Sequence, residues 1–265
     1  RHEVPGKTPD GMSADYLTEE GQQRASERGG EITEKNVAGY ASPKLRAQET
    51  VDLGLQEVDA GVRVINGQLE ALKGTGAEGR TDSQRPENAF RIKTKKELGV
   101  AENFKRIMED AKAWATDQID SGSKRSTYDL VVQFYLDNEE LCQERGVTTP
   151  NESARQTAYR AAREIRMTDH FLEDSDVRLI NVSHGPKLEP FLKQVLIDSA
   201  GKKGFESLEE IGGALNPGER FELKVDIDNQ GEKTIKLLLR GEEYDIDMDK
   251  VSGLADEYEE SLEKE

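Results

Sequence analysis

The stretch from Val177 to Leu196, VRLINVSHGPKLEPFLKQVL, decides the fold. Its first six residues form a largely apolar run that is typical of a buried strand. The run stops at Ser183-His184-Gly185, and the apolar residues that follow recur with the spacing of a helix packed on a sheet: Leu188, Phe191, Leu192, Val195 and Leu196. A polar imidazole, that of His184, therefore stands where a buried strand gives way to a helix.

An earlier segment shows the same strand-to-helix order. Residues 36–42, NVAGYAS, form a short strand candidate that ends at Ser42, and Pro43 opens the first turn of a predicted helix over 43–55. Before it, Thr18 is a candidate N-cap of a helix that the Gly29-Gly30 pair ends. Strands that alternate with helices predict an α/β protein, a three-layer α/β/α sandwich with a mostly parallel sheet.

Two further segments depart from this order. Residues from about 81 to 149 predict a largely helical insertion, on the helical spacing of Phe104, Ile107, Ala111 and Trp114. Residues from about 219 to 265 alternate around positions 229–231, Asn-Gln-Gly, which predicts a β-hairpin followed by an acidic helical tail. Because no long low-complexity linker interrupts the chain, we expect a single domain over residues 1–265.

Composition narrows the class of protein. The 265 residues include 37 basic and 54 acidic side chains, and the net charge of -17 disfavours nucleic acid and anionic membranes as partners. A single cysteine, Cys142, excludes an internal disulfide framework and a thiolate zinc cluster. No apolar window approaches the ~20 residues that span a bilayer. We expect a cytoplasmic protein, and the sequence leaves its oligomeric state open.

Polar side chains gather at the predicted strand ends. Arg1-His2 opens the sequence, Ser42 and Arg46 follow the strand over 36–42, and His184 follows the strand over 177–182. Ligands of parallel sheets bind at the carboxyl ends of the strands, so neighbouring strands would bring two imidazoles and two guanidiniums together. Arginine pairs bidentately with phosphate oxygens. A neutral imidazole can attack phosphorus while a second, protonated one stabilises the charge that develops on the phosphoryl oxygens.

Such a reaction also needs a proton donor for the leaving oxygen. Glu70, in the glycine-flanked segment NGQLEALKG, is the candidate. Asp59 before it and Glu78 after it are the alternatives if the loop folds differently. His170 has no comparable neighbours, and we interpret it as a partly exposed helix residue outside the site.

These segments, taken in order, resemble the histidine phosphatase superfamily, specifically its phosphoglycerate-mutase-like branch. RHE resembles the family's Arg-His-Gly signature, and YASPKLRAQET is very close to its Ser-x-x-x-Arg-Ala-x-x-Thr element. The other matching segments are DYLTEEGQQRA at 15–25, QLEALKG at 68–74, NES at 151–153 with Arg160 after it, and NVSHG at 181–185. The matches follow the family order and span most of the chain.

The resemblance implies a role for each candidate residue. His2 would be the nucleophile that forms a phosphohistidine, while Arg1, Arg46 and His184 hold the phosphate. Glu70 would be the acid that later acts as a base for water, and neither a metal nor a cofactor is implied. The insertion at about 81–149 would form a cap that selects the substrate, with a basic run that meets an anionic ester: Arg91, Lys93, Lys95 and Lys96.

Three departures from the family pattern bear on function. Glu3 replaces the usual glycine and places a carboxylate next to His2 in sequence, where it would reduce affinity for a dianion. Thr8 stands where the mutases carry an asparagine that contacts phosphate. The family also has a hydrophobic strand directly before its Arg-His pair, and we expect one before Arg1.

The sequence therefore favours a metal-independent phosphomonoesterase that works through a phosphohistidine on His2. Its activity should fall in acid as the nucleophile, with an ordinary pKa near ~6.5, becomes protonated. Two alternatives stay open: a phosphoglycerate mutase, and a catalytically weak member that binds phosphorylated ligands. The physiological ester is not predicted.

Overall fold

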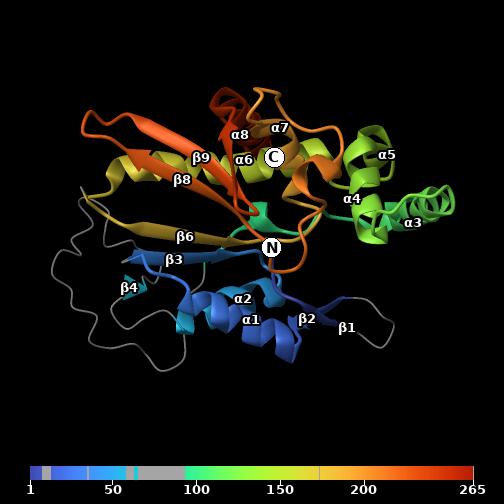
Figure 1. The fold of residues 1–265 in the computed structure, drawn as a ribbon, viewed down its shortest axis with the longest axis horizontal. Coiled ribbons are helices and arrows are strands. Elements are labelled where there is room, and N and C mark those ends of the chain that lie inside the picture. The colour runs from blue at the N-terminus through green and yellow to red at the C-terminus, as the bar shows by residue number, and fades with distance from the viewer. Residues whose placement is uncertain (8–12, 35, 58–62, 65–92, 173, 265) are drawn as a thin grey trace. The chain divides into compact units, whose positions relative to one another are not determined.

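The computed structural model describes residues 1–7, 13–34, 36–57, 63–64, 93–172 and 174–264 (Figure 1). They divide into two compact units. The first consists of Arg1–Gly99 and Glu164–His184, and the second of Val100–Arg163 and Gly185–Glu265. All the strands of the parallel sheet lie in the first unit, and all the strands of a separate antiparallel sheet lie in the second.

Strand β3 (Asn36–Ala41) is the centre of the parallel sheet. It pairs in parallel along its whole length with β6 (Val177–Val182), from Asn36↔Val177 to Ala41↔Val182. The short strands β4 (Arg63–Val64) and β5 (Lys93–Thr94) pair in parallel with its first and last residues. Because β6 occupies one edge of β3, β4 and β5 share the other edge. The predicted α/β class with a parallel sheet is confirmed.

Apolar side chains pack on both faces of this sheet, because side chains alternate along each strand. Those of β3 are largely buried, and those of β6 are mostly partly buried. One face packs against α2 (Leu45–Gln56), in a cluster of Val37, Ala41, Val182, Ile180, Ala47, Val51 and Leu55. The opposite face packs against the chain around the end of α6 (Pro150–Met167), in a cluster of Ala38, Tyr40, Val177, Leu179, Leu98, Met167 and Phe171. The two predicted strands are therefore core strands, packed on both faces.

Helix α1 (Glu19–Gly30) packs against α2, and the two lie on the same side of β3 in Figure 1. Its predicted limits are confirmed, because the Thr18 hydroxyl accepts the amide of Gly21 and the helix ends at Gly30. Gly29 permits the close approach of the helices: a Cβ there would lie 1.9 Å from the carbonyl oxygen of Gly54. Strands β1 (Pro5–Lys7) and β2 (Ser13–Leu17) form an antiparallel pair beside these helices.

Of the predicted helical insertion at about 81–149, residues 81–92 lie outside the described residues, and residues 93–98 are not α-helical. Residues 93–94 form β5, and a single 3-10 turn, η1, covers Lys96–Leu98. Residues 93–94 instead pair with Tyr40 and Ala41 of β3, and this pairing gives their backbone N–H and C=O groups hydrogen-bond partners. The helical spacing of side chains in the sequence does not reveal such a pairing with a distant strand. The helical part begins later and consists of α3 (Lys105–Asp120), α4 (Thr127–Asp137) and α5 (Glu139–Glu144).

The second unit also contains most of α6 (Pro150–Met167) and all of α7 (Glu189–Val195). The 3-10 turns η2 (Thr168–His170) and η3 (Leu208–Ile211) belong to the first and the second unit, respectively. The largest core cluster joins α6 and α7 to the C-terminal sheet and helix; its members include Ala158, Phe191, Leu192, Leu237, Leu239 and Val251. The apolar stripe that follows His184 in the sequence thus lies in this core.

The C-terminal hairpin and the acidic helix are confirmed. Strand β8 (Phe221–Ile227) pairs antiparallel with β9 (Lys233–Leu239), and α8 (Met248–Glu263) follows. The sequence analysis missed that the chain turns again, so that β10 (Glu242–Ile246) extends the sheet and in turn pairs with β7 (Leu196–Ile197). The predicted mostly parallel sheet therefore applies to the first unit. Among the described residues, no helix has the length and apolar character needed to cross a membrane.

Candidate functional site

Three of the predicted site residues meet at the carboxyl ends of β3 and β6, within the first unit: His2, Arg46 and His184. Ser42 follows β3, and its amide donates to the carbonyl of Val182 at 3.0 Å. His184 follows β6 by two residues, and the amide of His2 donates to the carbonyl of Ser183 at 3.0 Å. The start of the chain therefore lies beside the end of β6, which places His2 next to His184.

The two imidazoles are buried and close together. Their ring centroids lie 4.8 Å apart at an interplanar angle of 56°, and only 3% of His2 and 1% of His184 is exposed. Arg46, in the first turn of α2, spans both rings: its Nε lies 3.2 Å from His2 Nε2 and its Nη2 lies 3.4 Å from His184 Nδ1. One guanidinium thus contacts both histidines.

Hydrogen bonds fix the tautomer of His2. Its Nδ1 lies 2.6 Å from the carbonyl oxygen of Glu3, which only accepts, so Nδ1 carries the proton. Nε2 then carries the lone pair, which accepts the Nε–H of Arg46. His2 thus presents Nε2, the nitrogen that can act as a nucleophile, toward Arg46.

His184 has the opposite tautomer. Its Nδ1 faces the Arg46 guanidinium, which only donates, so Nδ1 carries the lone pair. Its Nε2 therefore carries the proton and donates to the hydroxyl oxygen of Ser42 at 2.5 Å. The same oxygen accepts the backbone amide of Lys44 at 3.1 Å. His184 is held between Ser42 on one side and Arg46 on the other.

Both imidazoles are neutral in this arrangement. Burial lowers the pKa of His2 to about 3, and the charges of Arg46 and Arg1 act in the same direction, against the opposing hydrogen bond to the Glu3 carbonyl. Burial also lowers the pKa of His184 strongly, assisted by His2 and Arg46. The protonated second imidazole expected during the reaction would therefore have to gain its proton against a lowered pKa.

The Glu3 carboxylate was expected to lie beside His2 and to reduce affinity for a dianion, but in the structure it pairs with an arginine of α1. The Glu3 side chain is fully buried and pairs with Arg28 of α1, Nη1 to Oε1, at 2.8 Å. Burial raises the pKa of this carboxyl group, and the charges of Arg28 and Arg24 oppose the rise. The carboxylate is thus held by α1, while the Glu3 carbonyl supports His2.

Of the other residues considered in the sequence analysis, the structure describes Arg1 and His170 but not Glu70 or its alternatives. Arg1 is partly buried, and its charge lowers the pKa of both histidines, which places it near them. Glu70, with its alternatives Asp59 and Glu78, lies outside the described residues, as do Thr8 and Arg91. His170 is exposed in η2, as expected.

Lys93, Lys95 and Lys96 are the described members of the basic run that was expected to meet an anionic ester. They lie in β5 and in the segment after it, at the carboxyl edge of the sheet. The amide of Lys95 donates to the carbonyl of Ala41 at 2.9 Å, and its Nζ lies 5.9 Å from the centre of the Tyr40 ring. The Ser183 hydroxyl donates to the carbonyl of Leu98 at 2.8 Å. The segment after β5 therefore crosses the ends of both β3 and β6.

The sequence analysis named Ser42 and Thr50 within the Ser-x-x-x-Arg-Ala-x-x-Thr element without giving either residue a role. The Thr50 hydroxyl accepts the amide of Glu3 at 3.2 Å and donates to the carbonyl of Arg46 at 2.8 Å. It thereby fastens the His2 segment to α2. The signal available in the sequence was the spacing, since Thr50 follows Arg46 by four residues and shares its helix face.

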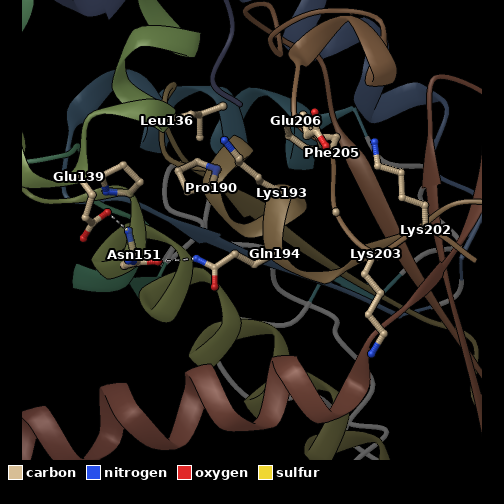
Figure 2. Close-up of a pocket in the computed structure, with 12 residues that line it drawn as sticks. Leu136, Glu139, Asn151, Pro190, Lys193, Gln194, Lys202, Lys203, Phe205 and Glu206 are labelled. Atoms are coloured by element: carbon tan, nitrogen blue, oxygen red, sulfur yellow. Dashed lines mark hydrogen bonds between the residues drawn. The ribbon is translucent and has the colours of Figure 1, made fainter.

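The second unit has a pocket of its own, of about 370 Å³ (Figure 2). Its lining includes the apolar residues Leu136, Pro150, Pro190 and Phe205, together with lysines and side-chain amides. Among the lining residues, Gln194 donates to Asn151 at 2.8 Å, and the Asn151 amide donates to Glu139 at 3.1 Å (Figure 2). No predicted site residue lines this pocket. Arg160 is buried on α6, in the same unit.

Within the described residues, no group of three or more histidine, cysteine, aspartate or glutamate side chains is arranged to hold a metal ion. The sequence matches no model of a known protein family, and no curated protein shows significant similarity to it. The site geometry and the ordered motifs therefore carry the functional argument.

Proposed function

We propose that the protein is a metal-independent phosphomonoesterase of the histidine phosphatase type, with His2 as its nucleophile. One observation carries the proposal: two buried, neutral imidazoles and an arginine converge at the carboxyl ends of two neighbouring parallel strands. The proposal includes a three-layer α/β/α fold of the phosphoglycerate-mutase-like kind. The packing of apolar side chains on both faces of the parallel sheet supports that arrangement.

In the first step, the Nε2 lone pair of His2 attacks phosphorus and the bond from phosphorus to the ester oxygen breaks. A low pKa keeps this lone pair unprotonated at neutral pH. Nδ1 keeps its proton through the bond to the Glu3 carbonyl, so the positive charge that forms on the ring is stabilised. The departing oxygen takes a proton from an acid, for which Glu70 is the proposal.

Arg46 must change partners during this step. Its Nε–H donates to the same Nε2 lone pair that attacks phosphorus. An arriving phosphate dianion offers stronger acceptors to a guanidinium than a neutral imidazole does. We expect Arg46 to turn its N–H groups to the phosphoryl oxygens, which frees the nucleophile only when an oxyanion is present.

In the second step, water attacks the phosphohistidine, the bond from phosphorus to nitrogen breaks, and inorganic phosphate leaves. The residue that gave its proton to the leaving group now removes one from water. Arg1, Arg46 and His184 hold the oxygens in both steps. The negative charge of the dianion raises the pKa of His184, against the lowering caused by burial, which allows this ring to take up a proton and donate it from Nδ1.

Phosphate release from an aryl phosphate tests the proposal. The His2→Ala variant should lose at least about 1,000-fold in kcat, because the covalent route is gone, and Glu70→Gln should lose about 100-fold or more on esters with poor leaving groups. His170→Gln is the matched control, since His170 is exposed and outside the site. Activity of His2→Ala equal to that of the wild type would contradict the proposal.

The two alternatives make different predictions in the same assay. A mutase would exchange phosphate between phosphoglycerates faster than it releases phosphate to water. A binding protein would retain a phosphate ester without turnover and lose that affinity in Arg46→Ala.

A further inference from the structure

The contact between Ser42 and His184 has no role in the reaction as proposed above. Both side chains are buried, with Ser42 0% and His184 1% exposed, so water does not compete for their hydrogen bond. The distance of 2.5 Å between Ser42 Oγ and His184 Nε2 is short for such a bond. A contact of this kind constrains the ring that it touches.

Ser42 is itself held from two sides. Its amide donates to the carbonyl of Val182, and its hydroxyl oxygen accepts the amide of Lys44. The strand end and the entry to α2 thus fix the position of the hydroxyl oxygen before any ligand binds. Because the contact with Arg46 leaves the lone pair of His184 on Nδ1, Nε2 carries the proton, and the fixed Ser42 oxygen is the group that accepts it.

We propose that Ser42 is the positioning residue of His184: it keeps the proton on Nε2 and so turns Nδ1 toward the phosphoryl group. The catalytic part of this inference rests on the proposed function. In the structure, Nδ1 of His184 lies 3.4 Å from Nη2 of Arg46, the arginine that also contacts the nucleophile. A phosphoryl oxygen that takes the place of this contact meets Nδ1. As the dianion binds, Nδ1 takes up a proton from water and donates it in a hydrogen bond to that oxygen, while Nε2 keeps its own proton on Ser42.

Three substitutions separate the hydroxyl from the space it fills. Ser42→Ala removes the acceptor, Ser42→Cys replaces it with a weak one of similar shape, and Ser42→Thr retains it. Thermal unfolding of each variant shows which of them fold, and either loss variant is sufficient for the test. His170→Gln and His2→Gln assign the signals, since the chain contains three histidines.

Nitrogen NMR of the histidine rings in the free protein is the first measurement, because it does not depend on turnover. The protonated and unprotonated ring nitrogens have well-separated shifts, so the tautomer is read directly. We expect the wild type and Ser42→Thr to carry the His184 proton on Nε2, and Ser42→Ala or Ser42→Cys to shift it toward Nδ1. A wild-type proton on Nδ1, or an unchanged tautomer in both loss variants, would overturn the inference.

Kinetics with an aryl phosphate is the second measurement. The kcat of Ser42→Ala and Ser42→Cys should fall about 10- to 100-fold, the worth of one hydrogen bond to a group that becomes charged, with little change in KM and with recovery in Ser42→Thr. A kcat within about twofold of the wild type would overturn the positioning role. If the wild type itself releases no phosphate, the proposed function fails, and the tautomer alone decides whether Ser42 orients His184.

Discussion

His2 and His184 are neutral for the same reason, which is burial. Protonation would place a positive charge in a site that already holds the Arg46 guanidinium. The acid limb of the activity should accordingly begin well below the ordinary histidine pKa of about 6.5, lower than the sequence alone indicated. A neutral imidazole at physiological pH is what a phosphohistidine route requires.

The same shifts predict how stability depends on pH. The pKa of each ring is lower in the folded than in the unfolded chain, so the stability they contribute is present above about pH 6.5 and is lost as the pH falls toward the folded values. Between those limits the unfolded chain binds more protons. Each histidine should therefore lower the free energy of unfolding by about 1 kcal/mol per pH unit.

Urea unfolding at several pH values between about 6.5 and 4 measures this slope. The His184→Gln variant should show a shallower decline than the wild type, whereas His170→Gln should match the wild type, because His170 is exposed. An equal decline in His184→Gln and the wild type would mean that the ring is not held neutral by the fold.

At the scale of residues, the sequence predicted which polar groups would meet but not how they bond. The placement of Ser42 and His184 follows from the carboxyl ends of parallel strands, a rule that holds for any such sheet. The tautomers depend on atoms of Glu3 and Ser42 that only tertiary packing brings near. For the same reason the Glu3 carboxylate could not be assigned to Arg28 from the sequence.

The packing of α1 against α2 is the element-scale feature that supports Arg46, since it holds α2 on the sheet. It depends on a glycine contact: a Cβ on Gly29 would lie 1.9 Å from the backbone oxygen of Gly54, which has no flexible side chain to move aside. A Cβ on the neighbouring Gly30 would meet no atom within 4 Å. Adjacent glycines of one helix thus differ completely in their surroundings.

We expect Gly29→Ala to destabilise the protein by about 2–3 kcal/mol, because the helices must separate to admit the methyl group. Gly30→Ala is the matched control and should be neutral or stabilising by up to about 1 kcal/mol, through the better helix propensity of alanine. Chemical unfolding of both variants measures the difference. Equal stabilities would show that the helices do not approach each other as closely as described.

The sequence predicted the helices and strands whose signals are local. It did not predict β5 and β10, whose structure depends on pairing with strands that other parts of the chain supply. Amphipathic spacing and capping located α1, α2, α7 and the β8–β9 hairpin, because these signals are local. The strand β5 has only two residues, and its pairing with β3 decides its structure. Strand β10 likewise depends on the turn that follows β9 and on its pairing with both β9 and β7.

At the scale of the whole molecule, charge opposes the proposed substrate. A chain of net charge -17 repels a phosphate dianion at long range, while Arg1 and Arg46 attract it at the site. The Debye length is about 30 Å at 0.01 M salt and about 8 Å at 0.15 M, so added salt removes the distant repulsion first. The local attraction acts over a shorter distance and persists.

The KM for an aryl phosphate should therefore fall as sodium chloride is raised from about 0.01 M to 0.15 M, with kcat nearly constant. Initial rates over a range of substrate concentrations at each salt concentration measure both quantities. A KM that rises steadily over the same range would show that the basic groups at the site dominate the field that the substrate meets.

The central claim is that His2 becomes phosphorylated, and trapping the intermediate tests it most directly. The protein is mixed with an aryl phosphate, quenched in alkali, where phosphohistidine survives, digested and analysed by mass spectrometry. We predict a phosphoryl group on His2 in the wild type and a larger amount in Glu70→Gln, whose intermediate should hydrolyse more slowly, with none in His2→Ala. Phosphate release by the wild type with no phosphoryl group on His2 in either protein would contradict the account.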